Sequence, residues 1–176
     1  MLNTRFNTIV KVLLILFFFT VFTYIYVWAE LYSRTSQYYE HAMELLNAKD
    51  YALAIKGQQV FDAQENTYIY KGGFQQIVIA WEHPFALPRP KIYGYAKDRI
   101  HEIITVKISA EEGMEIFKTY FRLDNRYLGE ILLRVGDIYR EQQNIEKAKE
   151  TYSLITEIFT LNEVLSQTAL ERLNTL

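Results

Sequence analysis

The sequence predicts an all-α chain in which an N-terminal transmembrane helix precedes antiparallel helical hairpins with an irregular proline-containing insertion. Three observations support this prediction. Residues 12–29 contain no Asp, Glu, Lys, Arg, Gly or Pro. Farther along, apolar residues recur at three- and four-residue spacings, which place them on one face of a helix. All three prolines fall within positions 84–90, where they interrupt any regular element.

The stretch 12–29 has the composition of a membrane span. A helix needs roughly 20 mainly apolar residues to cross a ~30 Å hydrocarbon core, and this run extends back past Lys11, whose long side chain can reach the interface. The predicted partner of this segment is the lipid bilayer. The residues expected to anchor it are Leu13, Phe17, Phe18, Phe22 and Trp28.

A secretory signal sequence is the alternative interpretation, because Val27-Trp28-Ala29 resembles a cleavage site. However, the apolar run is longer than the ~7–15 residues usual in such signals. Tyr24, Tyr26 and Trp28 also form an aromatic cluster that suits a membrane interface. These features favour a retained anchor.

The basic residues before the span indicate its orientation. Arg5 and Lys11 favour a cytoplasmic N-terminus, since positive charge is enriched on that side of membrane helices. We therefore expect residues 1–11 to form a cytoplasmic flank. The domain 30–176 is then expected in the periplasm or another extracytoplasmic space.

Composition excludes several function classes. The net charge is −2, whereas binding to nucleic acid needs a basic face. The chain has no cysteine, so disulfides, thiol nucleophiles and thiolate metal sites are excluded. No cofactor is predicted.

Residues 35–68 predict a first helical hairpin. Apolar and small residues around Ala42 lie on one face of a first helix, which ends near Lys49-Asp50. A second helix is expected from about Tyr51, with Ala54 and Phe61 among the residues that face back.

Residues 129–162 predict a second hairpin. Leu132, Gly136 and Tyr139 lie on one face of its first helix, and Ala148 and Tyr152 lie on its second. Residues 161–176 follow as an amphipathic capping helix. Its apolar face is expected to comprise Leu161, Val164, Leu165 and Leu173.

Both hairpins resemble the tetratricopeptide repeat, a helix-turn-helix unit of about 34 residues. Ala42 and Ala54 match the small residues of the family, as do Gly136 and Ala148, and each pair is twelve residues apart. The resemblance implies that small residues face each other where the helices cross. The repeat-packing residues are expected to be Ala42, Ala54, Gly136, Tyr139, Ala148 and Tyr152. A generic helical hairpin remains the alternative.

The middle segment, residues 69–128, departs from this pattern. Phe74 to Trp81 is an apolar stretch that fits a helix or a strand, and we expect mostly helix here. The prolines then form a loop, after which residues 92–108 resume as a helix. Ser109 followed by Glu112 has the spacing of a capping box, which opens another helix.

The residues offer no recognisable catalytic set. His41, His83 and His101 are scattered, and no segment supplies the three or four ligands that a metal site usually needs. We therefore predict no catalytic, cofactor or metal site and no enzyme.

The aromatic residues around the proline loop are the predicted partner-binding residues, because the loop has no periodic face that would bury them. They are Phe85, Leu87, Arg89, Tyr93 and Tyr95. The resulting hypothesis is a membrane-tethered adaptor or scaffold that assists assembly or maturation of a membrane or periplasmic protein complex. One alternative is a constitutive accessory subunit of such a complex, and another is an enzyme with an unrecognised site.

Overall fold

A computed structural model describes residues 2–176, with side chains described from Val10 onward. Arg5, in the predicted flank 1–11, therefore has its side chain outside the described part. The described chain is mostly helical and divides into two compact units, residues 1–97 and 98–176. It also contains a two-stranded sheet, which corrects the all-α prediction.

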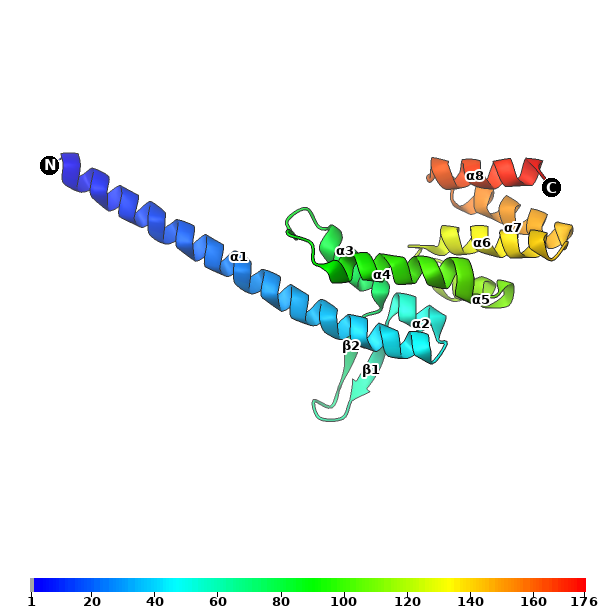
Figure 1. Cartoon of the computed structure of the whole chain (residues 1–176), viewed down its shortest axis with the longest axis horizontal. Coiled ribbons are helices and arrows are strands. Elements are labelled where there is room, and N and C mark those ends of the chain that lie inside the picture. The colour runs from blue at the N-terminus through cyan, green and yellow to red at the C-terminus, as the bar shows by residue number, and fades with distance from the viewer. Residues whose placement is uncertain (1) are drawn as a thin grey trace. The chain divides into compact units, whose positions relative to one another are not determined.

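Unit 1 begins with α1 (Leu2–Asn47), a continuous helix of 46 residues. Its C-terminal half packs against α2 (Tyr51–Lys56) and α3 (Phe74–Glu82), whereas its N-terminal half extends past both (Figure 1). The segment 74–81 is thus helical. Trp81 is fully buried, and its indole N–H donates to the Thr35 hydroxyl at 3.0 Å, which ties α3 to α1.

The predicted second helix of the first hairpin ends early. α2 stops at Lys56, and Gly57 follows with φ of +75°, a conformation that favours glycine. A β-carbon there would also lie 2.6 Å from the Lys71 carbonyl oxygen. The chain turns out of the helix, so Phe61 lies on a strand and the helix expected through it is wrong.

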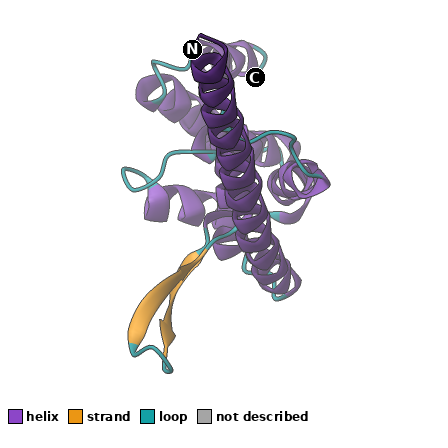
Figure 2. Ribbon diagram, turned by 90° about the vertical axis from the view of Figure 1, so that its left-hand side faces the viewer, coloured by secondary structure: helices purple, strands orange, loops and turns teal. Residues whose placement is uncertain are grey.

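An antiparallel hairpin takes the place of that helix. β1 (Gln58–Asp62) pairs with β2 (Thr67–Lys71), with Gln58 opposite Lys71 and Asp62 opposite Thr67. Figure 2 shows the two strands projecting from the helices. The run Thr67-Tyr68-Ile69-Tyr70 carries the β-branched and aromatic residues typical of strands, which is the signal that a helical interpretation overlooked.

The boundary between the units falls within α4 (Lys91–Glu102), which continues into a π-helical segment, η1 (Ile103–Lys107). Unit 2 then contains α5 (Ala110–Tyr120), α6 (Leu128–Glu141), α7 (Ile145–Ile158) and α8 (Glu163–Asn174). Each of these four helices packs on the next, and α8 also contacts α6.

Side-chain caps begin three of the unit 2 helices, and the sequence predicts the one at Ser109. Ser109 accepts from the Glu112 amide while the Glu112 carboxylate accepts from the Ser109 amide, a complete capping box for α5. Asn144 and Asn162 likewise accept amide hydrogens at the starts of α7 and α8. The turns between the unit 2 helices are therefore well defined.

Close helix crossings in unit 2 depend on small residues. A β-carbon at Gly136 of α6 would lie 2.4 Å from the Tyr152 ring of α7. The residue in contact with Gly136 is thus Tyr152, one turn beyond the expected Ala148, although Ala148 is fully buried as a crossing residue should be. Gly113 makes a similar approach to Val135.

Candidate interaction surfaces

The N-terminal half of α1 is an exposed apolar surface. Among the described residues, α1 alone is long and apolar enough to cross a membrane, with a mean hydropathy of 2.3 and none of that window buried. A signal sequence near an N-terminus shares these properties. Four of the predicted anchor residues are exposed, namely Leu13, Phe17, Phe18 and Phe22.

The proline loop between α3 and α4 is bound to the end of this apolar half. The Tyr24 hydroxyl lies between the carbonyl oxygens of Phe85, at 2.9 Å, and of Leu87. The indole N–H of Trp28 donates to the Pro88 carbonyl at 3.0 Å, and its ring packs edge-on against Trp81. The structure therefore brings Trp28, a predicted anchor residue, into contact with the proline loop.

The five predicted partner-binding residues separate into two groups. Phe85, Leu87 and Tyr95 have exposed apolar or aromatic side chains. Arg89 instead donates through Nε to the Trp81 carbonyl at 2.8 Å and lies over the Tyr93 ring at 5.2 Å. Arg89 and Tyr93 thus have a structural role in holding the loop to α3 and α4.

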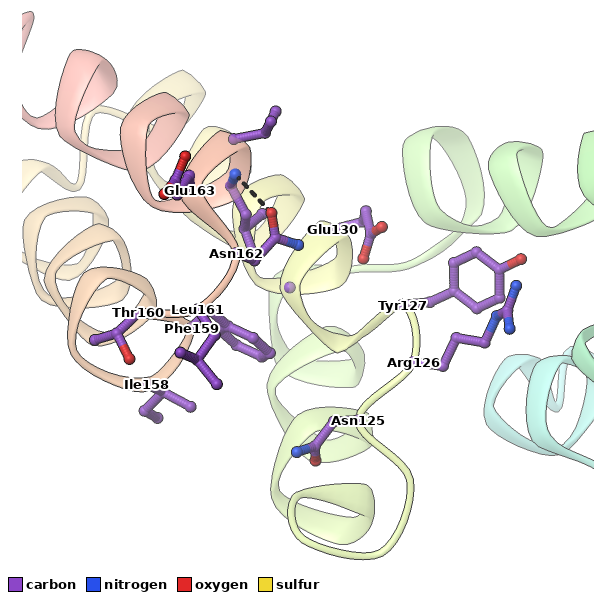
Figure 3. A pocket seen from close by; sticks show the side chains of 13 residues that line it. Asn125, Arg126, Tyr127, Glu130, Ile158, Phe159, Thr160, Leu161, Asn162 and Glu163 are labelled. Atoms are coloured by element: carbon purple, nitrogen blue, oxygen red, sulfur yellow. Dashed lines mark hydrogen bonds between the residues drawn. The ribbon is translucent and has the colours of Figure 1, made fainter.

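Unit 2 contains a groove where the start of α6 meets the turn from α7 to α8 (Figure 3). Its volume is about 760 Å³. Arg126, Glu130 and Glu163 supply charged groups, and Ile158, Phe159 and Val164 supply apolar surface. Such a mixture can hold a segment with both apolar and polar side chains.

Two residues at the rim of this groove show that the apolar face predicted for residues 161–176 is partly wrong. Leu161 is 100% exposed and Val164 is 77% exposed, whereas Leu165 and Ala169 are buried. α8 begins only at Glu163, so its buried stripe is set by the four-residue spacing of Leu165 and Ala169. The two outward residues were missed as surface candidates because their spacing alone resembles that of a core.

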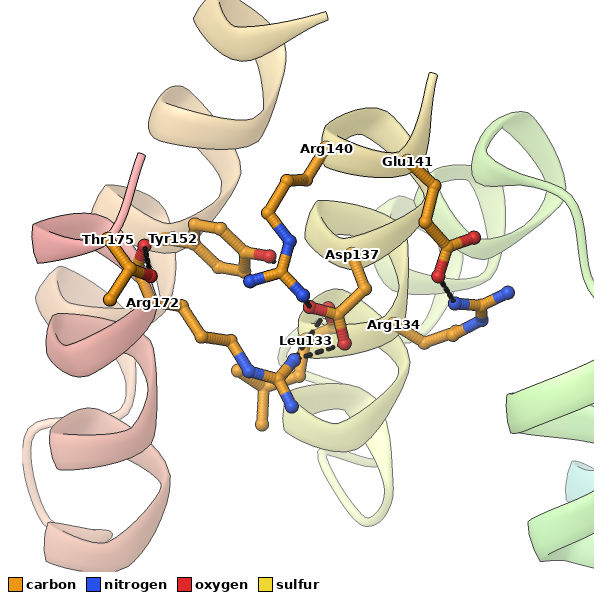
Figure 4. Close-up of polar contacts among 8 residues, drawn as sticks. All are labelled: Leu133, Arg134, Asp137, Arg140, Glu141, Tyr152, Arg172 and Thr175. Atoms are coloured by element: carbon orange, nitrogen blue, oxygen red, sulfur yellow. Dashed lines mark hydrogen bonds and ion pairs between the residues drawn. The ribbon is translucent and has the colours of Figure 1, made fainter. Parts of the chain in front are cut away.

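A polar cluster toward the C-terminal ends of α6 and α8 joins three helices of unit 2 (Figure 4). The Tyr152 hydroxyl of α7 donates to Asp137 of α6 at 2.7 Å, and Arg172 of α8 pairs with the same carboxylate. Arg140 lies 3.6 Å from it. Burial, together with the bond to Asp137, raises the pKa of Tyr152 to about 12. These contacts satisfy the groups within the fold and indicate a packing role.

The histidines lie in separate environments. His41 contacts Gln58 at 3.3 Å and Glu44 at 3.8 Å, while His83 accepts the Phe85 amide at 3.4 Å. His101 lies on α4. Within the part of the chain that the structure describes, no three His, Cys, Asp or Glu residues are placed to hold a metal ion.

The predicted repeat-packing residues are all buried. Ala42 and Ala54 are fully buried in unit 1, and Tyr139, Ala148 and Tyr152 are buried in unit 2. Gly136 lies beneath the Tyr152 ring. Burial alone is also the property of any helical hairpin, so it leaves the repeat resemblance as a hypothesis.

Comparison with protein-family models, with curated proteins and with solved structures found no match.

Proposed function

We propose that this chain is a non-enzymatic, membrane-tethered adaptor whose unit 2 groove binds a protein of a membrane or envelope complex. The observation that supports this proposal most directly is the exposure of Leu161 and Val164 on the groove rim. Water contact with two large apolar side chains is unfavourable, at about 25 cal/mol per Å². A partner that covers them would recover this free energy.

The tether in this proposal is the apolar half of α1. Twenty residues from Val10 to Ala29 rise about 30 Å as a helix, which matches the hydrocarbon core. A cleaved signal is less compatible with the contacts of Tyr24 and Trp28, because cleavage after Ala29 would remove two side chains that bind the loop. Arg5 and Lys11 favour a cytoplasmic N-terminus and extracytoplasmic units.

The groove defines the kind of segment that would bind. Leu161 and Val164 form an exposed apolar part of the groove, and Arg126, Glu130 and Glu163 supply charged groups in its lining. We infer a short peptide segment that presents one or two apolar anchors flanked by polar groups. Apolar anchors in pockets typically contribute most of the binding free energy at such interfaces.

We further propose that α6 and α7 form a tetratricopeptide-like pair capped by α8. The close approach of Gly136 to Tyr152 and the burial of Ala148 support this interpretation. Terminal caps with one buried stripe are required in helical arrays, and α8 buries Leu165 and Ala169 in this way.

Site-specific photocrosslinking tests the groove. A photoreactive residue at Leu161 should capture a discrete protein in cells, whereas one at Leu170, which is exposed on α8 outside the groove, should not. The double change Leu161→Ser with Val164→Ser should weaken recovery of that protein, while Leu170→Ser should leave it unchanged. Equal crosslinking at both positions would argue against a partner in the groove.

A histidine control separates this function from an enzyme. Replacing His41, His83 and His101 together with Gln should leave recovery of the partner intact. Loss of cellular function with full partner recovery would instead support acid-base or metal chemistry. Because Gln58 contacts His41, the folded state of this variant is checked by its circular dichroism.

A further inference from the structure

Few backbone N–H groups of the proline loop need a hydrogen bond to water. Pro84, Pro88 and Pro90 have no amide hydrogen. The amides of Ala86 and Leu87 donate to the His83 carbonyl at 2.9 Å and to the Tyr24 hydroxyl at 3.3 Å.

The amide of Phe85 donates to the His83 ring at 3.4 Å. Each amide hydrogen between positions 84 and 88 therefore has an acceptor within the protein.

Aromatic side chains of α1 lie against three of the loop carbonyls, and the single hydroxyl hydrogen of Tyr24 can be donated to one of two of them at a time. Tyr24 lies against the Phe85 and Leu87 carbonyls, and Trp28 donates to the Pro88 carbonyl. Irregular backbone exposed to lipid within the hydrocarbon region needs its hydrogen bonds satisfied by protein groups. The contacts with α1 meet part of this requirement for the segment that carries Phe85 and Leu87.

The side chains at the same positions point outward. Phe85 is 77% exposed and Leu87 is 51% exposed, while Ala86 between them is buried. Tyr24 and Trp28, to which their backbone is bound, occupy the last turns of the apolar stretch 12–29. Tyr and Trp at the ends of membrane helices lie at the level of the lipid headgroups. The loop is thus held at the depth of that interface.

We propose that the loop 83–90 inserts into the interfacial layer of the membrane leaflet from which α1 emerges, with Phe85 and Leu87 in contact with lipid. The ligand is a lipid bilayer, and the segment that carries the exposed Phe85 and Leu87 is hydrogen-bonded to Tyr24, itself exposed at the end of the apolar half of α1. This inference rests on the proposed membrane anchor. The loop would provide a second attachment point, which would fix the orientation of unit 1 on the membrane. Under this proposal Phe85 and Leu87, which the sequence predicts to bind a protein partner, contact lipid instead.

The absence of native cysteine allows a direct test in the full-length chain. Single cysteines are introduced by Phe85→Cys and, separately, Leu87→Cys, and each is labelled with the environment-sensitive fluorophore NBD. The proteins are reconstituted in phosphatidylcholine–phosphatidylglycerol nanodiscs, in which both bilayer faces are open to solvent. Quenching is measured with lipids that carry a nitroxide near the headgroup and with aqueous iodide.

Two matched positions serve as controls. Tyr68→Cys places the label on another exposed aromatic position of unit 1, on β2. Gly72 at the base of this strand lies against Tyr38, ten residues or about 15 Å farther along α1 than Trp28. Phe18→Cys places the label at the middle of the proposed span. Circular dichroism confirms the helical content of each labelled protein.

The expected result is emission at shorter wavelength and strong quenching by nitroxide lipid at positions 85 and 87, with iodide quenching only at position 68. If positions 85 and 87 behave like position 68, the insertion is wrong. If they resist both quenchers, a second copy of the chain covers the loop instead, which also overturns it. If iodide quenches the label at position 18, which an inserted span would shield from water, the membrane anchor itself fails, so the two failures are distinguishable.

Discussion

The hydroxyl of Tyr152 donates a 2.7 Å hydrogen bond to the carboxylate of Asp137, which joins α7 to α6. Arg172 pairs with the same carboxylate from α8, so one side chain connects three helices of unit 2. This arrangement stabilises the fold that presents the groove. It also makes the stability of unit 2 sensitive to charge and to pH.

Asp137→Asn should destabilise unit 2. The change removes the negative charge that faces Arg172 and Arg140 and weakens the Tyr152 bond, and hydrogen bonds to charged groups contribute about 1.5–3 kcal/mol. Urea unfolding of the full chain in detergent measures the loss. Glu141→Gln is the control, because the Glu141 side chain that pairs with Arg134 is 58% exposed, against 16% for Asp137, and exposed pairs contribute about 0–1 kcal/mol. Equal effects would contradict a special role for Asp137.

Stability should fall at high pH because of Tyr152. Its pKa rises from the model-compound value of 10.0 to about 12, so the folded state retains the proton more strongly than the unfolded state. The resulting stabilisation is fully present below pH 10 and is lost as the pH rises toward 12. Tyr152→Phe should remove this component, seen as a smaller fall in stability over that range than in the unchanged chain. Parallel curves for the two proteins would refute it.

Gly136→Ala should destabilise the α6–α7 crossing, although alanine favours helices. The added β-carbon would meet the Tyr152 ring at 2.4 Å, and such overpacking typically costs about 1–3 kcal/mol. Gly94→Ala is the matched control on α4, where a β-carbon has no neighbour within 4 Å. That change should stabilise the chain by roughly 0.5–1 kcal/mol. Thermal unfolding of both variants measures the two changes in stability, which should be opposite in sign. A Gly136→Ala variant that is more stable than the unchanged chain would disprove the close contact.

Phe18→Arg should impair membrane insertion. An arginine at the centre of a membrane helix costs about 2.5–3.5 kcal/mol on the insertion scale. The variant should become extractable by alkaline carbonate, whereas Phe18→Leu should stay in the membrane fraction. N-terminal sequencing of the unchanged protein should find residues before Glu30. A mature chain that begins at Glu30 would show that the apolar segment is a signal sequence.

Local features of the chain were predictable from the sequence by itself. The uncharged run 12–29 forms a helix, Ser109 with Glu112 forms a capping box, and the prolines form an irregular loop. Each of these outcomes depends on interactions within a turn or two of the chain, such as hydrogen bonds to the next few amides or a missing N–H.

Only the tertiary structure determined which distant residues meet. Gly57 ends α2 through a backbone approach to Lys71, so the hairpin replaces a helix that the spacing of Ala54 and Phe61 favoured. Likewise Leu161 is exposed and Leu165 buried because α8 packs through one stripe, and the sequence spacing does not specify which stripe. The contact of Tyr24 with Phe85 and Leu87 spans some sixty residues. Such contacts arise from the packing of whole elements, which periodicity within one segment does not encode.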